Sequence, residues 1–278
     1  MKAIYLRNER LILGLAMGVM LLVAWEGFAR GWWADALQPF IGAGAEKLRI
    51  RPIFISSPTA VAAAAWRLYV QTGEIWPHLR LSAFELVAGL GLAIVVGIPF
   101  GLVSGRYRRV AQASEPFMAA LNATPQVAFL PLIILWLGTG LATRVFIIFL
   151  LALLPLFIAA HAAVRTLDAR LMKVATSFGS SEWFLFRAII LPGSVPFLLA
   201  GLRLAIGRGM IGIVVGELYG SATGIGLMIN RAGTTFQTDV VFVGVFTIVV
   251  AGLLLSEIVR RIETKVEVWR PNARGVDG

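Results

Sequence analysis

Residues 165–196 have the sequence RTLDARLMKVATSFGSSEWFLFRAIILPGSVP and lie between two long apolar segments. Their first half carries apolar residues at helical spacing, namely Leu171, Val174, Ala175 and Phe178. This spacing predicts a short helix with one apolar face. Gly179 is expected to end that helix in a tight turn, because glycine tolerates a positive φ.

The second half of the segment predicts another short helix. Ser180 and Ser181 are candidate N-caps, and Glu182 would lie in the first turn, where the helix dipole favours an acid. Three aromatic residues follow, which are Trp183, Phe184 and Phe186. Such a pair of helices either docks a partner protein, packs beneath its own helix bundle, or lies on the membrane. The residues alone leave these alternatives open.

The flanking sequence indicates an all-α polytopic membrane protein. Of the 278 residues, 58% are hydrophobic and only 14% are charged, against about a quarter charged in soluble domains. Six segments have the length and apolarity of a membrane crossing. They are residues 11–29, 82–104, 115–137, 144–164, 195–219 and 239–259. Pro125 and Pro131 interrupt the third segment and are expected to kink it.

The distribution of Lys and Arg residues predicts the orientation of the spans in the membrane. With a cytoplasmic N-terminus, fifteen of the 25 Lys and Arg residues fall on the inner side and eight, including Arg144, on the outer side. The excess places both termini in the cytoplasm. The expected organisation is an N-terminus of residues 1–10, a transmembrane domain of 11–259 and a cytoplasmic tail of 260–278. An outer loop covers about 30–81, and the inner loop covers about 165–193.

The outer loop has structure of its own in this prediction. Ser57-Pro58-Thr59 is a helix-start signal, and residues 60–70 follow as a short amphipathic helix. The tryptophans of this region suit an interfacial belt. Glycines recur at four-residue spacing in three spans, which predicts close helix packing. They are Gly14 and Gly18; Gly97, Gly101 and Gly105; and Gly212, Gly216 and Gly220.

Charged and polar residues within the spans are candidates for a substrate path. The clearest are Glu217 and Glu85, with Arg203 and Arg208 in the fifth span. Thr124 and Gln126 lie on the proline-broken third span, and Asn122 and Asn230 are similar candidates. We assign Thr124, Gln126, Arg203 and Glu217 to the candidate substrate path. Arg203 could instead pair with a carboxylate, and Glu217 could instead accept hydrogen bonds at a helix end. The chain has no cysteine, and its two histidines, His78 and His161, lack ligand-like spacing. We therefore expect no metal and no catalytic residue.

Residues 173–192 resemble the inner loop of bacterial ABC importer permeases. That family carries Glu-Ala-Ala, three residues, Gly, nine residues, Ile, one residue and Leu-Pro. This chain has the same spacing, and it matches in identity at Ala175, Gly179, Ile189, Leu191 and Pro192. It departs at Lys173, where the family has Glu, and at Val174.

Further segments resemble the nitrate, sulfonate and taurine branch of the family. They include Thr124-Pro125-Gln126-Val127-Ala128-Phe129-Leu130-Pro131-Leu132, Gly201-Leu202-Arg203 and Gly224-Ile225-Gly226. The resemblance implies the type I importer fold and a permease subunit that carries a small, anionic solute through the bacterial inner membrane. It implies three partners: an ATPase dimer, a second permease subunit and a periplasmic binding protein.

The resemblance also implies that residues 168–187 form coupling helices seated on the ATPase. The residues it assigns to coupling are Lys173, Ala175, Gly179, Ser180, Trp183, Ile189, Leu191 and Pro192. The chain has no Walker A motif, so ATP and Mg²⁺ are expected on the partner, and the chain is not an enzyme by itself. An ion-coupled secondary transporter is the alternative, although it gives no reason for the Gly179 loop. The sequence does not name the solute.

Overall fold

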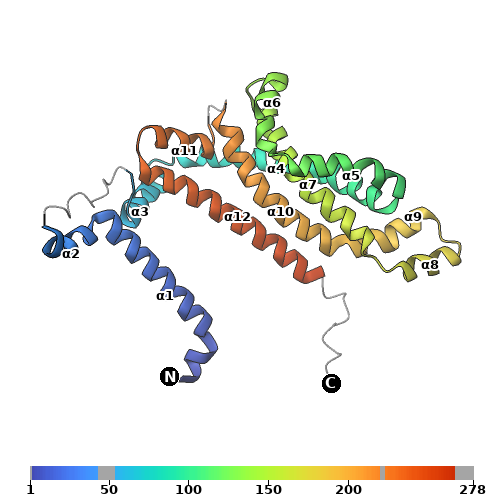
Figure 1. The fold of residues 1–278 in the computed structure, drawn as a ribbon, viewed down its shortest axis with the longest axis horizontal. Coiled ribbons are helices and arrows are strands. Elements are labelled where there is room, and N and C mark those ends of the chain that lie inside the picture. The colour runs from blue at the N-terminus through green and yellow to red at the C-terminus, as the bar shows by residue number, and fades with distance from the viewer. Residues whose placement is uncertain (1, 43–53, 220–222, 267–278) are drawn as a thin grey trace. The chain divides into compact units, whose positions relative to one another are not determined.

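The structure is a computed structural model that describes residues 2–42, 54–219 and 223–266. The regular secondary structure of these ranges is helical, and they contain no strand (Figure 1). The elements in order are α1 (Lys2–Arg30), α2 (Trp32–Ile41), α3 (Pro58–Trp66), the π-helical turn η2 (Arg67–Gln71), α4 (Ile75–Arg106), α5 (Arg108–Ala123), the 3₁₀ turn η3 (Gln126–Phe129), α6 (Leu130–Leu137), α7 (Leu141–Arg165), α8 (Ala169–Ser177), α9 (Glu182–Leu185), the π-helical turn η4 (Phe186–Ile190), α10 (Leu191–Leu218), α11 (Ile225–Thr234) and α12 (Thr238–Val266).

Within the described residues, five helical segments are long and apolar enough to cross a membrane, and one bent pair of helices makes a sixth crossing if it counts as a single span. The five are Ile12–Arg30, Ile75–Arg106, Leu141–Arg165, Glu182–Leu218 and Thr238–Lys265. They confirm the predicted all-α polytopic fold. Several helices are longer than predicted, since α4 begins at Ile75 within the expected outer loop and α7 begins at Leu141. Arg144, expected outside the membrane, therefore lies in the first turns of α7, where it is buried.

The bent pair corresponds to the third predicted span. Arg108–Ala123 and Gln126–Leu137 meet at 91°. Thr124, which precedes Pro125, has an extended backbone with φ −90° and ψ 134°. A residue before proline is pushed out of the helical region in this way. The predicted interruption at Pro125 is therefore confirmed, and it is a break between two helices.

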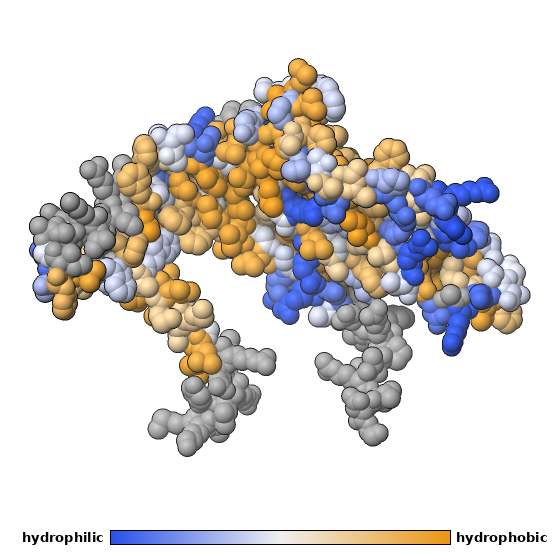
Figure 2. Space-filling view, viewed as in Figure 1, coloured by the Kyte–Doolittle hydropathy of each residue, from blue (hydrophilic) through white to orange (hydrophobic). Residues whose placement is uncertain are grey.

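The chain divides into two compact units. Residues 77–227 and 248–278 form the larger unit, and residues 1–76 and 228–247 form the smaller one. In the larger unit α7 and α10 pack along each other, and α4 and α12 add to the same core. Buried side chains from these four helices fill it, among them Leu86, Ile148, Ile206 and Val259. On the face shown in Figure 2, hydrophobic side chains cover much of α12, whereas hydrophilic ones gather around α5 and α8.

Glycines allow α4 to approach α7 closely. A Cβ atom at Gly101 would lie 2.5 Å from the backbone oxygen of Phe157, and one at Gly105 would lie 2.7 Å from that of His161. Gly97, Gly212 and Gly216 face α7 in the same manner, so the packing prediction is confirmed for two spans. For Gly14 and Gly18 it stays a prediction, because no described atom lies within 4 Å of a Cβ at either position. Gly220 lies outside the described residues.

In the smaller unit the predicted helix after Ser57 is confirmed as α3 and η2. The Ser57 hydroxyl accepts a hydrogen bond from the Ala60 N–H at 3.3 Å and caps α3. Glu26 of α1 accepts from the Thr59 N–H at 3.1 Å and from the Thr59 hydroxyl at 2.8 Å. A carboxylate within the first span thus holds the start of a helix far along the chain.

Candidate functional site

A tight turn joins α8 to α9 in the loop that the sequence singled out. Gly179 has φ +73°. Its N–H donates to the Thr176 carbonyl at 3.0 Å, and the Ser180 N–H donates to the Ala175 carbonyl at 3.2 Å. These two bonds form a Schellman motif, which satisfies the last carbonyls of a helix through a left-handed residue. The glycine turn predicted from the sequence is therefore present.

Each helix of the loop has a side-chain cap. Asp168 accepts from the Arg170 N–H at 2.7 Å at the start of α8. Ser181 accepts from the Phe184 N–H at 3.2 Å at the start of α9. Caps satisfy N–H groups that have no partner inside the helix, so both short helices have defined ends. Of the two candidate serines, Ser181 is the one that caps α9.

The loop is anchored to the helices of the larger unit on one side. Met172, Phe186 and Leu167 pack against the buried Leu102, Ala160 and Ile190. Arg106, at the end of α4, forms a salt bridge with Glu182 at 2.8 Å. From Glu182 onward, α9, η4 and α10 form one continuous helical segment as far as Leu218. A force applied to α9 is therefore carried directly into a membrane-spanning helix.

The opposite side of the loop presents apolar side chains without cover in the described structure. Phe178 is 85% exposed and Trp183 is 69% exposed. Leu171, Val174 and Phe184 are exposed as well. We call these five residues the loop face. Outside the membrane spans, an exposed apolar cluster marks a site of interaction with a protein or with the membrane surface.

The residues that the resemblance assigned to coupling lie along this loop. Lys173 is exposed on α8, Ala175 is half-buried, and Gly179 and Ser180 form the turn. Trp183 belongs to the loop face, while Ile189 is half-buried in η4. Leu191 and Pro192 are exposed at the start of α10. Their role in coupling stays a prediction.

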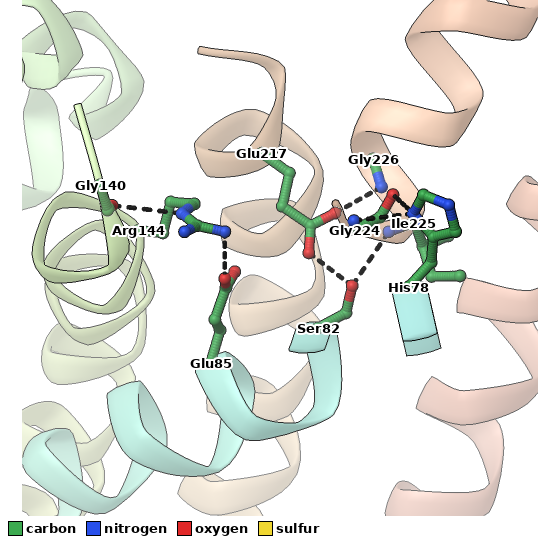
Figure 3. Close-up of polar contacts among 9 residues, drawn as sticks. All are labelled: His78, Ser82, Glu85, Gly140, Arg144, Glu217, Gly224, Ile225 and Gly226. Atoms are coloured by element: carbon green, nitrogen blue, oxygen red, sulfur yellow. Dashed lines mark hydrogen bonds and ion pairs between the residues drawn. The ribbon is translucent and has the colours of Figure 1, made fainter. Parts of the chain in front are cut away.

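A second polar assembly holds the N-terminus of α11 (Figure 3). Glu217 of α10 is fully buried and accepts hydrogen bonds from the Ser82 hydroxyl and from the Gly226 N–H. The Ser82 oxygen accepts from the Ile225 N–H at 3.0 Å. His78 Nδ1 accepts from the Gly224 N–H at 2.8 Å. Three successive N–H groups at the start of α11 are thereby satisfied by α4 and α10.

The same assembly continues to α7 through an ion pair. The Arg144 guanidinium binds Glu85 Oε1, and its Nε donates to the Gly140 carbonyl at 3.2 Å. Glu85 is fully buried and Arg144 is 8% exposed. Such a pair is costly to break, because removal of one partner leaves a buried charge uncompensated. Sequence analysis noted Glu85 but missed its partner, since the two residues lie 59 positions apart.

The four candidate path residues are not brought together. Thr124 and Gln126 lie at the break between α5 and α6, Arg203 pairs with Glu263 of α12, and Glu217 belongs to the α11 assembly. Gln126 is 7% exposed, and neither side-chain amide atom has a hydrogen-bond partner in the described part of the chain. An unpaired buried amide is unfavourable. Their assignment to a path stays a prediction.

Comparisons with known proteins agree on one class. Residues 97–268 match the family model described as "Binding-protein-dependent transport system inner membrane component". The aliphatic sulfonates transport permease protein SsuC of Bacillus subtilis is 33% identical over 206 residues, which are 74% of this chain and 75% of that protein. The taurine transport system permease protein TauC of Escherichia coli is 28% identical over 242 residues, which are 86% and 85% of the two chains.

Solved structures include a chain with a similar fold. A chain of the MetNI methionine ABC transporter, in inward-facing conformations, aligns with a TM-score of 0.60. The alignment covers 70% of this chain and 97% of that one, at 16% identity. At this identity the likeness concerns the fold alone.

Proposed function

Because this chain belongs to the family of binding-protein-dependent inner membrane transport components, we propose that its loop face docks an ATPase subunit. Within that family the chain is a permease of the sulfonate, taurine and nitrate branch, and it has the type I importer fold. ATP hydrolysis on that separate subunit then drives transport. The observation that carries the proposal is the uncovered loop face on two capped, anchored helices. The family resemblance of residues 173–192 supports the same role.

The loop has the mechanical properties that coupling requires. The Schellman turn and the two caps make α8 and α9 a rigid unit. A rigid helix pair transmits a displacement of a bound partner, whereas a floppy loop would absorb it. The displacement reaches α10 through the continuous helix that begins at Glu182. Closure of the ATPase dimer would thereby switch the direction in which the pathway opens.

Lys173 gives this docking surface a basic character. Members of the family carry Glu at the matching position, whereas Lys173 and Arg170 are both exposed here. A lysine offers only hydrogen-bond donors. The groove of the ATPase that receives this loop is therefore expected to present carboxylates or backbone carbonyls opposite Lys173.

The other partners of the permease and its orientation in the inner membrane follow from the same proposal. Two permease subunits enclose the pathway, since one subunit supplies half of the wall. A periplasmic binding protein delivers the solute, which carries an acidic group in keeping with the names of the sulfonate and taurine relatives. Both termini face the cytoplasm of the inner membrane, as the distribution of Lys and Arg indicates. ATP and Mg²⁺ bind to the partner, and the permease itself needs no cofactor.

Substitutions on the loop face test the docking. We expect Phe178→Ser and Trp183→Ser to release the ATPase subunit during co-purification and to abolish ATP-driven uptake into proteoliposomes. Two equally exposed aromatic residues outside the loop provide matched controls. Phe40 is 84% exposed on α2, and Trp136 is 70% exposed on α6. Serine at either control position should retain the ATPase. Full ATPase binding by both loop variants, or uptake without any ATPase subunit, would overturn the proposal.

A further inference from the structure

Arg208 lies deep within α10 and has no partner in the described part of the chain. It stands 17 residues after Leu191, the first residue of α10, and 10 residues before Leu218, the last. These separations are about 25 Å and 15 Å along a helix axis. No hydrogen bond or ion pair joins its guanidinium to another described residue, and the side chain is half-buried. The cation is therefore accessible and has no counter-charge.

The other two charged residues of α10 are both held by partners. Arg203 forms an ion pair with Glu263 of α12. Glu217 accepts hydrogen bonds from the Ser82 hydroxyl and from the Gly226 N–H. Such contacts explain these two charges as parts of the fold. Arg208 has no structural explanation of this kind, and an ionisable residue within a span is then a candidate for function.

One face of α10 beside Arg208 is uncovered in the described structure. Gly201 and Gly212 turn toward α7, where an added Cβ would contact that helix. The opposite side carries four exposed residues at i, i+4, i+7 and i+11, namely Ala200, Leu204, Gly207 and Ile211. Nothing described lies within 4 Å of a Cβ at Gly207. Arg208 follows Leu204 by four residues and precedes Ile211 by three, so it neighbours both on the helix surface. We call Leu204, Gly207, Arg208 and Ile211 the open face.

Lipid, a second permease subunit or water could cover the open face. Lipid is unfavourable, because an unpaired guanidinium is costly in hydrocarbon and reaches the headgroups only from near a helix end. A subunit contact would have to supply a carboxylate. In a second copy of this chain Glu85 is held by Arg144 and Glu263 by Arg203. Water needs no partner and leaves the charge free for a solute.

The broken span lies on the same side of α10 as Arg208. Val215 follows Arg208 by seven residues, which places the two on one helix face, and it packs against the core cluster of α6 and α7. α6 is the second half of the broken span, and Thr124 and Pro125 before it have extended backbone. Non-helical backbone at membrane depth occurs where protein buries it or where it lines a water-filled cavity. The unpaired cation and the helix break thus indicate the same side of α10.

A cavity between α5 and α7 is less suited to an acidic solute. Its volume is about 270 Å³, and its walls are mostly apolar, with Met118, Phe157 and Ile158 among them. The acid in its wall is Glu115, which lies 3.9 Å from Arg165. A carboxylate repels an acidic group, whereas the guanidinium of Arg208 attracts one and can bind it with two hydrogen bonds.

We propose that the open face of α10 lines the water-filled pathway, and that Arg208 binds the acidic group of the solute as it passes. The inference rests on the permease function proposed above and assigns one residue to the selection of anions. Gly207 leaves room for the solute beside the guanidinium, and Leu204 and Ile211 form the wall on either side. Arg203 and Glu217 have no part in this selection, because their charges are already compensated.

Single cysteines test whether water reaches the open face. The chain has no cysteine of its own, so Leu204→Cys supplies one thiol. The permease–ATPase complex in lipid nanodiscs is treated with the anionic reagent 2-sulfonatoethyl methanethiosulfonate, and mass spectrometry of the permease follows the reaction. The reagent attacks the thiolate, which forms where water reaches the sulfur. Leu253→Cys on α12 is the matched control, since Leu204 is 67% exposed and Leu253 is 64% exposed.

We expect Leu204→Cys to react at least tenfold faster than Leu253→Cys, because water surrounds the first and lipid the second. Equal rates at the two positions would overturn the proposal. An unreactive Leu204→Cys would do so too, and a subunit contact would then be shown if Arg208→Glu separates the permease subunits and an added Glu115→Arg restores them.

Reagents of opposite charge test the role of Arg208 itself. Gly207→Cys is treated in parallel with the anionic reagent and with its cationic analogue, 2-(trimethylammonium)ethyl methanethiosulfonate. Arg208→Gln should lower the ratio of the anionic to the cationic rate about fivefold. Attraction of one reagent and repulsion of the other each change a rate about two- to threefold when the charges are about 7 Å apart in water. Arg208→Lys keeps the charge and should keep the ratio. An unchanged ratio in Arg208→Gln refutes the assignment.

Failure of this inference is distinguishable from failure of the proposed function, because the loop-face variants test docking without any thiol reagent. Release of the ATPase by Phe178→Ser and Trp183→Ser, together with an unchanged rate ratio in Arg208→Gln, would leave the permease function intact and reject the role of Arg208. Full ATPase binding by both loop variants would reject the function itself, whatever the rates at Leu204→Cys and Gly207→Cys.

Discussion

Replacement of Gly179 by valine tests whether the turn between α8 and α9 transmits the motion of the ATPase. The residue has φ +73°, and nothing in the described structure lies within 4 Å of a Cβ atom at this position. A new side chain therefore meets no steric obstacle from its neighbours. The whole cost of the substitution comes from the left-handed backbone, which side chains other than glycine adopt at about 1–2 kcal/mol, with β-branched residues at the upper end.

This free-energy cost lowers the fraction of molecules in which the loop adopts the turn. A penalty of about 1–2 kcal/mol changes a local equilibrium by about 5- to 30-fold. The two Schellman hydrogen bonds, at 3.0 and 3.2 Å, exist only while Gly179 keeps its positive φ. Gly179→Val should therefore loosen the angle between α8 and α9 without harming insertion of the spans.

The measurement is the number of solute molecules imported per ATP hydrolysed by proteoliposomes that contain the complete complex. We expect Gly179→Val to lower this ratio several-fold, either by weaker ATPase binding or by hydrolysis without transport. Gly179→Asn is the matched control, since asparagine tolerates the left-handed region better than other residues with a side chain. An unchanged ratio in the valine variant would refute the reasoning. A defect of equal size in the asparagine variant would show that the cause is the side chain and not the backbone.

Three further outcomes are expected in thermal or chemical unfolding of the purified protein. Glu217→Ala should destabilise the protein by about 3 kcal/mol or more, because it removes an acceptor of two buried hydrogen bonds, and Glu217→Gln should cost less. Gly101→Ala should cost about 1–3 kcal/mol through overpacking against α7, whereas Gly91→Ala, on the same helix with nothing within 4 Å, should be neutral or stabilising. A double-mutant cycle on Arg106 and Glu182 should give a coupling below about 1 kcal/mol that weakens with salt, because both side chains are partly exposed.

The sequence predicted those parts of the fold that depend on local chemistry. Apolar length identified the crossings, and Pro125 identified the break of the third one. Gly179 and Ser181 likewise marked the turn and the cap of the inner loop, since each effect involves residues at most a few positions apart. The angle of the break could not be predicted, because a proline only removes helical geometry. The two halves meet at 91°, and both of them contact α7, which lies further along the chain.

The buried polar assembly could not be predicted, because its partners are distant in sequence. Glu85 and Arg144 are separated by 59 positions, Ser82 and Glu217 by 135, and His78 and Gly224 by 146. Hydropathy identifies a carboxylate in a span, but it carries no information on the group that the carboxylate binds. The cavity between α5 and α7 was missed for the same reason. His161 appeared isolated in the sequence, and only the packing of α4 and α5 brings Ser104, Ser114 and Glu115 to it.

Two acidic residues within the spans have the same structural role, although charged residues at such positions are usually interpreted as functional. Glu26 accepts hydrogen bonds from Thr59 at the start of α3, and Glu217 accepts from Gly226 at the start of α11. Each carboxylate lies close to the end of a long apolar helix, α1 or α10. A carboxylate from that longer helix satisfies these donors and also complements the positive end of the dipole.

This arrangement separates two kinds of charged residue within the spans. Glu26 and Glu217 each have both carboxylate oxygens engaged by donors of this chain, so neither offers a free oxygen to a solute. Glu115 has contacts of 3.9 Å only and lines a cavity. A carboxylate whose hydrogen bonds are complete stabilises the fold, whereas one whose hydrogen bonds are incomplete is available to a cation. By this criterion the acids of α1 and α10 hold the starts of α3 and α11.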